Sequence, residues 1–138
     1  MTSTIVRERR LMPARIQRKR TRGWTAPLDT QGRKPLYVGR GTRWGNPARV
    51  VHRKDTGGWH VEYDNGGGVG VFPTAAEARM FAVVVYEHHL AAHPYLAAAV
   101  REELAARDLM CWCPLPAPGQ PDHCHARVLI ELANGPTA

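Results

Sequence analysis

Short runs of alternating or continuous apolar residues in the first half of the chain predict β-strands. Glycine, proline, asparagine and aspartate, the residues that favour turns, bound these runs. The turn residues 55–58 lie between two of the runs and predict a hairpin. Because strands this short are unstable alone, we expect helices to pack against them. The predicted strands span residues 36–38, 48–53, 59–63 and 69–72.

Apolar residues in the second half recur three and four positions apart, which is the period of an amphipathic helix. Thr74 and Glu77 have the spacing of a capping box, so a helix should begin there. Pro94 suits the first turn of a second helix. The predicted elements of this half are helices that begin near residues 74 and 94, a buried strand at 108–113 and a final helix at 126–133.

The order of these elements predicts an α/β or α+β fold, in which about three helices pack on one small mixed sheet. A length of 138 residues fits one domain. We assign residues 15–138 to it and residues 1–14 to a flexible basic arm. The hydrophobic share of 43% is typical of a globular chain. No apolar run approaches the roughly 20 residues of a membrane span, so we expect no membrane partner.

The beginning of the chain and its cysteine count predict a cytoplasmic protein. The first ten residues become charged without the apolar core of a signal peptide. Three cysteines are too few for a secreted disulfide scaffold, so a reducing compartment is expected.

Positive charge is concentrated in the first part of the chain. Residues 1–54 contain 15 lysines and arginines and two acidic residues, which gives a net charge of +13. Residues 55–138 contain 4 arginines and 10 acidic residues, which gives a net charge of −6. Together they give the net charge of +7. Such asymmetry favours an anionic partner, either a phosphate-bearing small molecule or a nucleic acid. The alternative is a solvated basic arm that binds nothing specific.

All three cysteines are expected to meet at one end of the fold. Cys111 and Cys113 lie two apart on a predicted strand, so both thiols should share a face. Cys124 and His125 begin the last helix, whose amino end should adjoin the end of that strand. Three readings stay open: a zinc site of Cys111, Cys113, Cys124 and His125, a reactive Cys124 with His125 or His123 as its base, or small cysteines that pack a core.

A glycine-rich loop at residues 39–47 is the second candidate site. Arg40 and Arg43 could grip a phosphate, Trp44 could stack on a base, and Asn46 could contact a polar edge of the ligand. Arg18 and Arg20 would extend the same positive surface. The loop lacks the lysine of a P-loop and is not followed by a helix pattern. Alternatively, Trp44 fills the core and the arginines are solvated.

Three motifs in this order give the chain a family resemblance. They are the segment from Pro13 to Trp24, the segment from Tyr37 to Pro47, and the segment from Asp108 to Cys113 together with Cys124-His125-Ala126 and residues 129–134. The chain resembles, from about residue 13 to residue 134, the bacterial and phage family catalogued as domain of unknown function 4326. It differs from the family in two places. It has Arg40-Gly41 where the family often has Arg-Pro, and its loop between Cys113 and Cys124 is longer than in the family. The resemblance implies that the three motifs form one shared surface.

Two functions compete on these observations. In the first, the domain is an enzyme of hydrolase or transferase type that binds a nucleotide or a nucleic-acid end, with Trp44 or Trp112 against a base and with zinc or a thiol at the cysteines. In the second, it is a non-catalytic nucleic-acid-binding module with a structural zinc ion or packed cysteines. The enzyme requires the arginine loop and the thiols to face one cavity.

Overall fold

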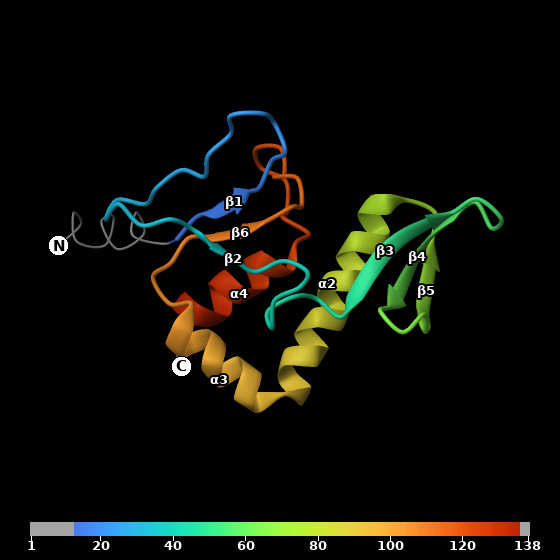
Figure 1. Cartoon of the computed structure of the whole chain (residues 1–138). Helices are drawn as coiled ribbons and strands as arrows, with labels where there is room; N and C mark the ends of the chain where they lie inside the picture. Colours follow the sequence, from blue (N-terminus) through green and yellow to red (C-terminus); the bar gives the residue numbers. More distant parts are fainter. Residues whose placement is uncertain (1–12, 136–138) are drawn as a thin grey trace.

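The computed structural model describes residues 13–135, and its strands form two separate three-stranded sheets (Figure 1). The first sheet is parallel and has the order β1-β6-β2. Its central strand pairs with residues that lie more than 70 positions away in sequence. Because the three strands are parallel, their carboxyl ends meet at one edge. The strands are β1 (Arg15–Gln17), β2 (Leu36–Tyr37) and β6 (Leu109–Cys111).

The second sheet is antiparallel and projects from the body of the molecule (Figure 1). The predicted hairpin is confirmed, because the first two strands pair from Ala48–Tyr63 to Arg53–Gly58 around the turn. Strand β3 is an edge strand of this sheet and pairs only with β4. The strands are β3 (Ala48–Arg53), β4 (Gly58–Tyr63) and β5 (Gly68–Phe72).

Three helices complete the fold, and all three were predicted from the sequence. Thr74 caps the first of them, since its hydroxyl accepts a hydrogen bond from the Glu77 amide at 3.2 Å. Pro94 occupies the first turn of the second, as expected. The third packs against β6 and β1. The helices are α2 (Ala75–Ala92), α3 (Pro94–Glu103) and α4 (His125–Asn134).

Helix α2 connects two hydrophobic cores. Ala78 and Ala82 near its beginning pack under the antiparallel sheet, and Tyr86 and Leu90 near its end pack in the main core under the parallel sheet. The loop at residues 39–47 carries the chain from one sheet to the other. Gly41 in this loop has φ +94°, a conformation that other residues rarely adopt.

The predicted α+β class is confirmed, with two differences of detail. The strands form two sheets rather than one, and β1 arises within the arginine-rich segment, where no strand was expected. Strand β6 ends at Cys111, so Cys113 lies beyond the strand and not on its face as predicted. Residues 1–12 of the predicted arm lie outside the described residues. Within residues 13–135, none of the helices has both the length and the apolar character that a bilayer crossing requires.

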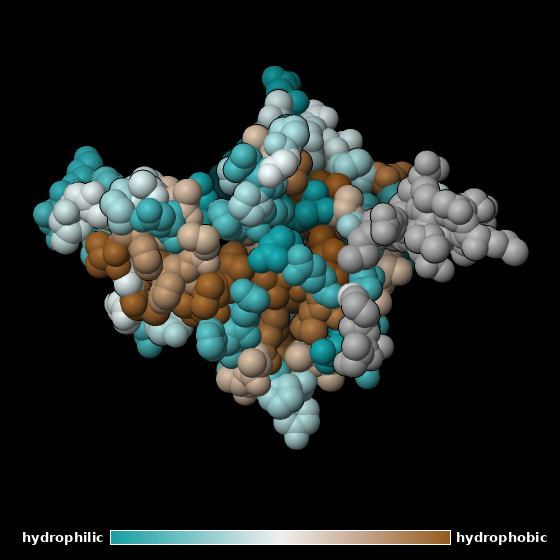
Figure 2. Space-filling view, turned by 180° about the vertical axis from the view of Figure 1, so that it is seen from behind, coloured by the Kyte–Doolittle hydropathy of each residue, from teal (hydrophilic) through white to brown (hydrophobic). Residues whose placement is uncertain are grey.

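Seen from behind, the surface has hydrophobic areas over the antiparallel sheet and the middle of the molecule, with hydrophilic residues around them (Figure 2). Large apolar side chains that remain exposed on this sheet and on α2 include Val71, Met80 and Val84. The two main cores therefore leave part of the apolar surface uncovered.

Candidate functional site

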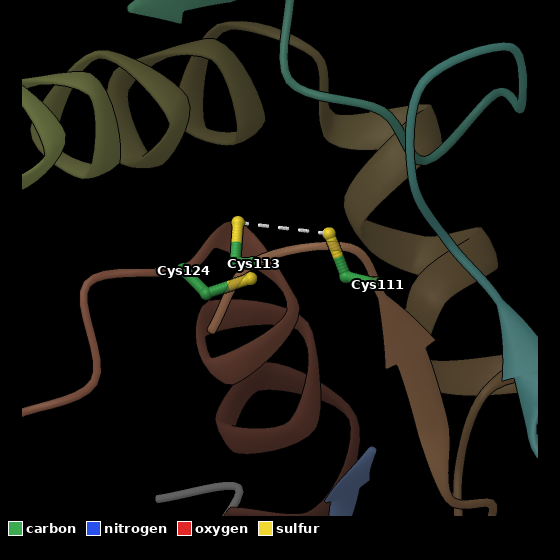
Figure 3. A group of neighbouring side chains, drawn as sticks. All are labelled: Cys111, Cys113 and Cys124. Atoms are coloured by element: carbon green, nitrogen blue, oxygen red, sulfur yellow. Dashed lines mark hydrogen bonds between the residues drawn. The ribbon is translucent and has the colours of Figure 1, made fainter. Parts of the chain in front are cut away.

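The three cysteines converge at the carboxyl end of β6 (Figure 3). Cys111 ends the strand, Cys113 follows it, and Cys124 precedes the first residue of α4. Their sulfur atoms all lie within 4.8 Å of one another. The convergence predicted from the sequence is therefore confirmed, although it arises from a strand end, a loop and a helix N-cap.

The spacing of the sulfur atoms suits a tetrahedral metal ion. Zn–S bonds of about 2.3 Å in a tetrahedral site place two sulfur atoms about 3.8 Å apart. The Sγ atoms of Cys111 and Cys113 lie 3.8 Å apart. Cys111 and Cys124 are buried and Cys113 is half-buried, so the site is shielded but not closed. Thiolate ligands favour soft or borderline ions such as zinc.

Close contact among the thiols separates their pKa values. Hydrogen bonds with Cys113 and Cys124 lower the pKa of Cys111 far below its usual range. The hydrogen bond with Cys111 raises the pKa of Cys113 to about 11. Hydrogen bonds with both neighbours, together with burial, raise the pKa of Cys124. A bound cation would lower the pKa of all three thiols, because it favours their thiolate form.

His125 does not join the cysteines as the sequence predicted. Its ring is buried, and Nε2 lies 2.8 Å from the carbonyl oxygen of Val38, to which it donates a hydrogen bond. The ring also packs edge-on against Tyr86, with centroids 5.2 Å apart. Within residues 13–135, the group of ligand atoms around the sulfurs contains three cysteines and no histidine. His125 therefore ties α4 to the end of β2.

A cavity of about 300 Å³ adjoins the cysteine cluster. Its walls come from the loop at 39–47, the edge strand β3, the first half of α2, and the β6–α4 connection. The arginine loop and the cysteines are 64 or more positions apart in sequence, yet they share one cavity, as expected from the sequence. All three cysteines, both neighbouring histidines and several loop residues line it: Arg40, Asn46, Ala48, Arg49, Val50, Arg79, Ala82, Val83, Cys111, Trp112, Cys113, His123, Cys124 and His125.

Three exposed arginines give this cavity a positive rim. Arg40 comes from the loop, Arg49 from β3 and Arg79 from α2. Arg40 forms an exposed ion pair with Asp64, whereas Arg49 and Arg79 form none within residues 13–135. No acidic residue of the described chain lines the cavity. The amino end of α4, where unpaired amides and the helix dipole favour anions, also faces it.

Trp44 and Asn46 hold the loop in place and do not suit the ligand contacts expected of them. The Trp44 ring is buried in the main core, and its carbonyl accepts a 2.6 Å hydrogen bond from Tyr86. Asn46 donates through Nδ2 to the Ala82 carbonyl and accepts from the Ala48 amide, both at 2.9 Å. Trp44 therefore fills the core, which is the alternative that the sequence left open for it.

The other predicted arginines lie outside the cavity. Arg43 pairs with Glu103 at 3.1 Å and covers the Trp44 ring at 4.6 Å. Arg18 and Arg20 lie over the Trp112 ring, with guanidinium carbons 4.9 and 4.7 Å from its centroid. Because Trp112 also lines the cavity, Arg18 and Arg20 contact a residue of the cavity wall.

Arg15 fixes the geometry of the cysteine loop, a role that was not predicted from the sequence. Its guanidinium donates to both carboxylate oxygens of Asp122, at 2.6 and 2.9 Å. It also donates to the carbonyls of Cys113 and Pro114, each at 2.7 Å. Only 5% of the Arg15 side chain is exposed. This contact network joins β1 to both ends of the proline-rich loop that separates Cys113 from Cys124.

Sequence reasoning also missed Arg49 and Arg79. Arg49 lies within the predicted strand at residues 48–53, and nothing in the sequence of that strand marks it as a ligand-binding residue. Arg79 is an exposed residue early in α2 and carries no local motif. Only the packing of α2 between the two sheets brings both side chains to the cysteines.

Comparison with known proteins gives one match. A family model described as Domain of unknown function (DUF4326) matches residues 16–135, which include both sheets and all three helices apart from the first residue of β1. No curated protein and no solved structure matches the chain.

Proposed function

The chain belongs to the family described as a domain of unknown function, DUF4326, and from that premise we propose that its cavity binds a phosphate-bearing nucleotide beside a zinc ion. The single observation that carries this proposal is the shared cavity. Thiols that suit a metal and arginines that suit a phosphate line the same 300 Å³ space. Sites for small ligands occupy roughly 300–1,000 Å³, so the cavity reaches the lower end of that range.

The charges of the cavity support an anionic ligand. Guanidinium groups bind phosphate oxygens in pairs, and Arg49 and Arg79 have no ion pair within residues 13–135 that a phosphate would need to displace. The amino end of α4 adds amide donors on the same wall. A ligand phosphate held here would lie next to the cysteines.

The cysteine cluster supports zinc as the metal. Three thiolates would hold the ion, and His125 is engaged with the Val38 carbonyl. A zinc ion with three protein ligands keeps a fourth position for water or substrate and supplies Lewis-acid chemistry there. We therefore favour an enzyme of hydrolase or transferase type over a non-catalytic module. The free thiols also favour the cytoplasm, where they stay reduced.

The test combines metal analysis with ligand binding. Protein purified under reducing conditions should contain one zinc ion per chain, and Cys124→Ser should lose it. The zinc-loaded protein should bind thymidine 5′-monophosphate in a calorimetric titration. Arg79→Gln should weaken this binding at least about tenfold, since charge-assisted hydrogen bonds are worth about 1.5–3 kcal/mol.

Arg101→Gln is the matched control, because Arg101 is an exposed helical arginine on α3 that does not line the cavity. It should leave the affinity within about twofold. Equal weakening by both variants would show that net charge and not the cavity governs binding. Absence of zinc, together with unchanged metal content in Cys124→Ser, would refute the metal assignment.

A further inference from the structure

Two arginines and two aromatic rings form a chain of cation–π contacts that reaches the cavity wall at Trp112. The Arg18 guanidinium carbon lies 5.0 Å from the Tyr37 ring and 4.9 Å from the Trp112 ring, so it bridges the two. Arg20 lies 4.7 Å from the Trp112 ring. We call these four residues the stacking ladder. Cation–π contacts hold the ladder together, and 36% of Trp112 remains exposed.

The parallel sheet places the ladder beside the cysteines. Arg18 follows β1, Trp112 follows β6, and Tyr37 ends β2, so all three stand at the carboxyl ends of neighbouring strands. The Arg18 amide donates a 2.8 Å hydrogen bond to the Cys111 carbonyl, which continues the pairing of β1 with β6. This backbone hydrogen bond therefore fixes the position of Arg18 next to the sheet. Trp112 belongs both to the ladder and to the cavity wall.

Positive charge continues along the chain from Arg18. The basic segment, residues 18–22, contains four cations, of which Lys19, Arg20 and Arg22 are exposed. No acidic residue occurs between Pro13 and Leu28. Flat groups that alternate with cations on one surface are the features with which proteins bind single-stranded nucleic acid, since bases stack on the rings and phosphates meet the cations.

We infer that the ligand class of the cavity is the phosphorylated end of a single-stranded nucleic acid. The terminal nucleotide enters the cavity, and the following nucleotides cross the stacking ladder and the basic segment. This inference rests on the proposed function, because it places the terminal phosphate at the arginine rim. It adds a prediction that a mononucleotide site does not make, namely that affinity grows with the length of the strand.

The test compares thymidine 5′-monophosphate with a 5′-phosphorylated oligothymidylate of eight nucleotides on the zinc-loaded protein. The longer strand should bind at least about tenfold more tightly, because each stacked base and each neutralised phosphate adds affinity. The double variant Arg20→Gln/Arg22→Gln should remove most of this gain and leave the affinity for the mononucleotide within about twofold. Its salt slope with the longer strand should fall by about 1.4, since single strands release about 0.7 counterion per phosphate.

A control variant with the same loss of charge, Lys54→Gln/Arg101→Gln, should retain the gain with length. Lys54 lies in the turn between β3 and β4 and Arg101 in α3, away from the ladder. Equal affinity for the two ligands would overturn the inference and leave the mononucleotide site intact. Binding of the longer strand alone, with loss in Arg20→Gln/Arg22→Gln, would support the ladder and refute the cavity proposal. Inorganic polyphosphate that binds as tightly as the oligonucleotide would refute the stacking role.

Discussion

Replacement of Arg15 by methionine should destabilise the fold more than any change at the cavity rim. The substitution keeps the apolar stem but leaves the Asp122 carboxylate without its bidentate partner, at a side-chain exposure of 16%. The carbonyls of Cys113 and Pro114 also lose donors at 2.7 Å. Breaking one side of a buried ion pair costs about 3–5 kcal/mol, against a total stability of about 5–15 kcal/mol for a domain.

Urea denaturation of the metal-free protein measures this cost directly. Arg43→Met is the matched control, because its 3.1 Å ion pair with Glu103 is exposed at both partners and should contribute less than about 1 kcal/mol. Arg15→Lys keeps the positive charge but loses the two parallel hydrogen bonds of the guanidinium group. Its loss of unfolding free energy should therefore lie between those of Arg15→Met and Arg43→Met, and the variant should still fold. Adding Asp122→Asn to Arg15→Met should recover part of the loss, since the unpaired buried charge is removed. Equal free energies of unfolding for Arg15→Met and Arg43→Met would refute the reasoning.

Two further substitutions test the anchoring of the loop at residues 39–47 and an ion pair of the antiparallel sheet. Tyr86→Phe should cost about 1–3 kcal/mol in urea denaturation, because it leaves the buried Trp44 carbonyl without its 2.6 Å hydrogen bond; a loss near zero would contradict the loop anchor. Glu62 accepts two hydrogen bonds from Arg53, which lower the pKa of its carboxyl from the ordinary 4.5. The pair therefore stabilises the fold above about pH 4.5, and this contribution is lost as the pH falls through the lowered pKa. The stability difference between the parent protein and Glu62→Gln should shrink over that acid range, and a difference independent of pH would exclude the ion pair as its source.

The sequence predicted elements well where the signals were local. The Thr74 cap, the proline at the start of α3 and the turn at 55–58 each act through neighbouring residues, so their positions were confirmed. The separation into two sheets was not predictable in this way. It depends on pairing of β6 with strands more than 70 residues away, and no local pattern specifies that pairing.

The candidate site residues also divide into those that local patterns could predict and those that depend on long-range packing. The cysteines could be placed together because strand ends and helix starts adjoin in α/β units. The contacts of His125 and Trp44 depended on which way buried rings turn, and the ring of each is directed into the core. Arg15 and Arg79 resembled ordinary basic residues in the sequence. Their roles follow from a half-buried carboxylate and a cavity wall that only the folded chain provides.

The central claim is that the arginines and the thiols serve one ligand, and alkylation of the cysteines tests it most directly. Cys113, the half-buried thiol of the three, is reacted with iodoacetamide in metal-free, reduced protein, with and without thymidine 5′-monophosphate. The nucleotide should slow the reaction in a saturable manner, with a midpoint equal to its dissociation constant, and Arg79→Gln should shift that midpoint upward. A rate that stays unchanged while the nucleotide saturates the protein would show that ligand and thiols occupy different places.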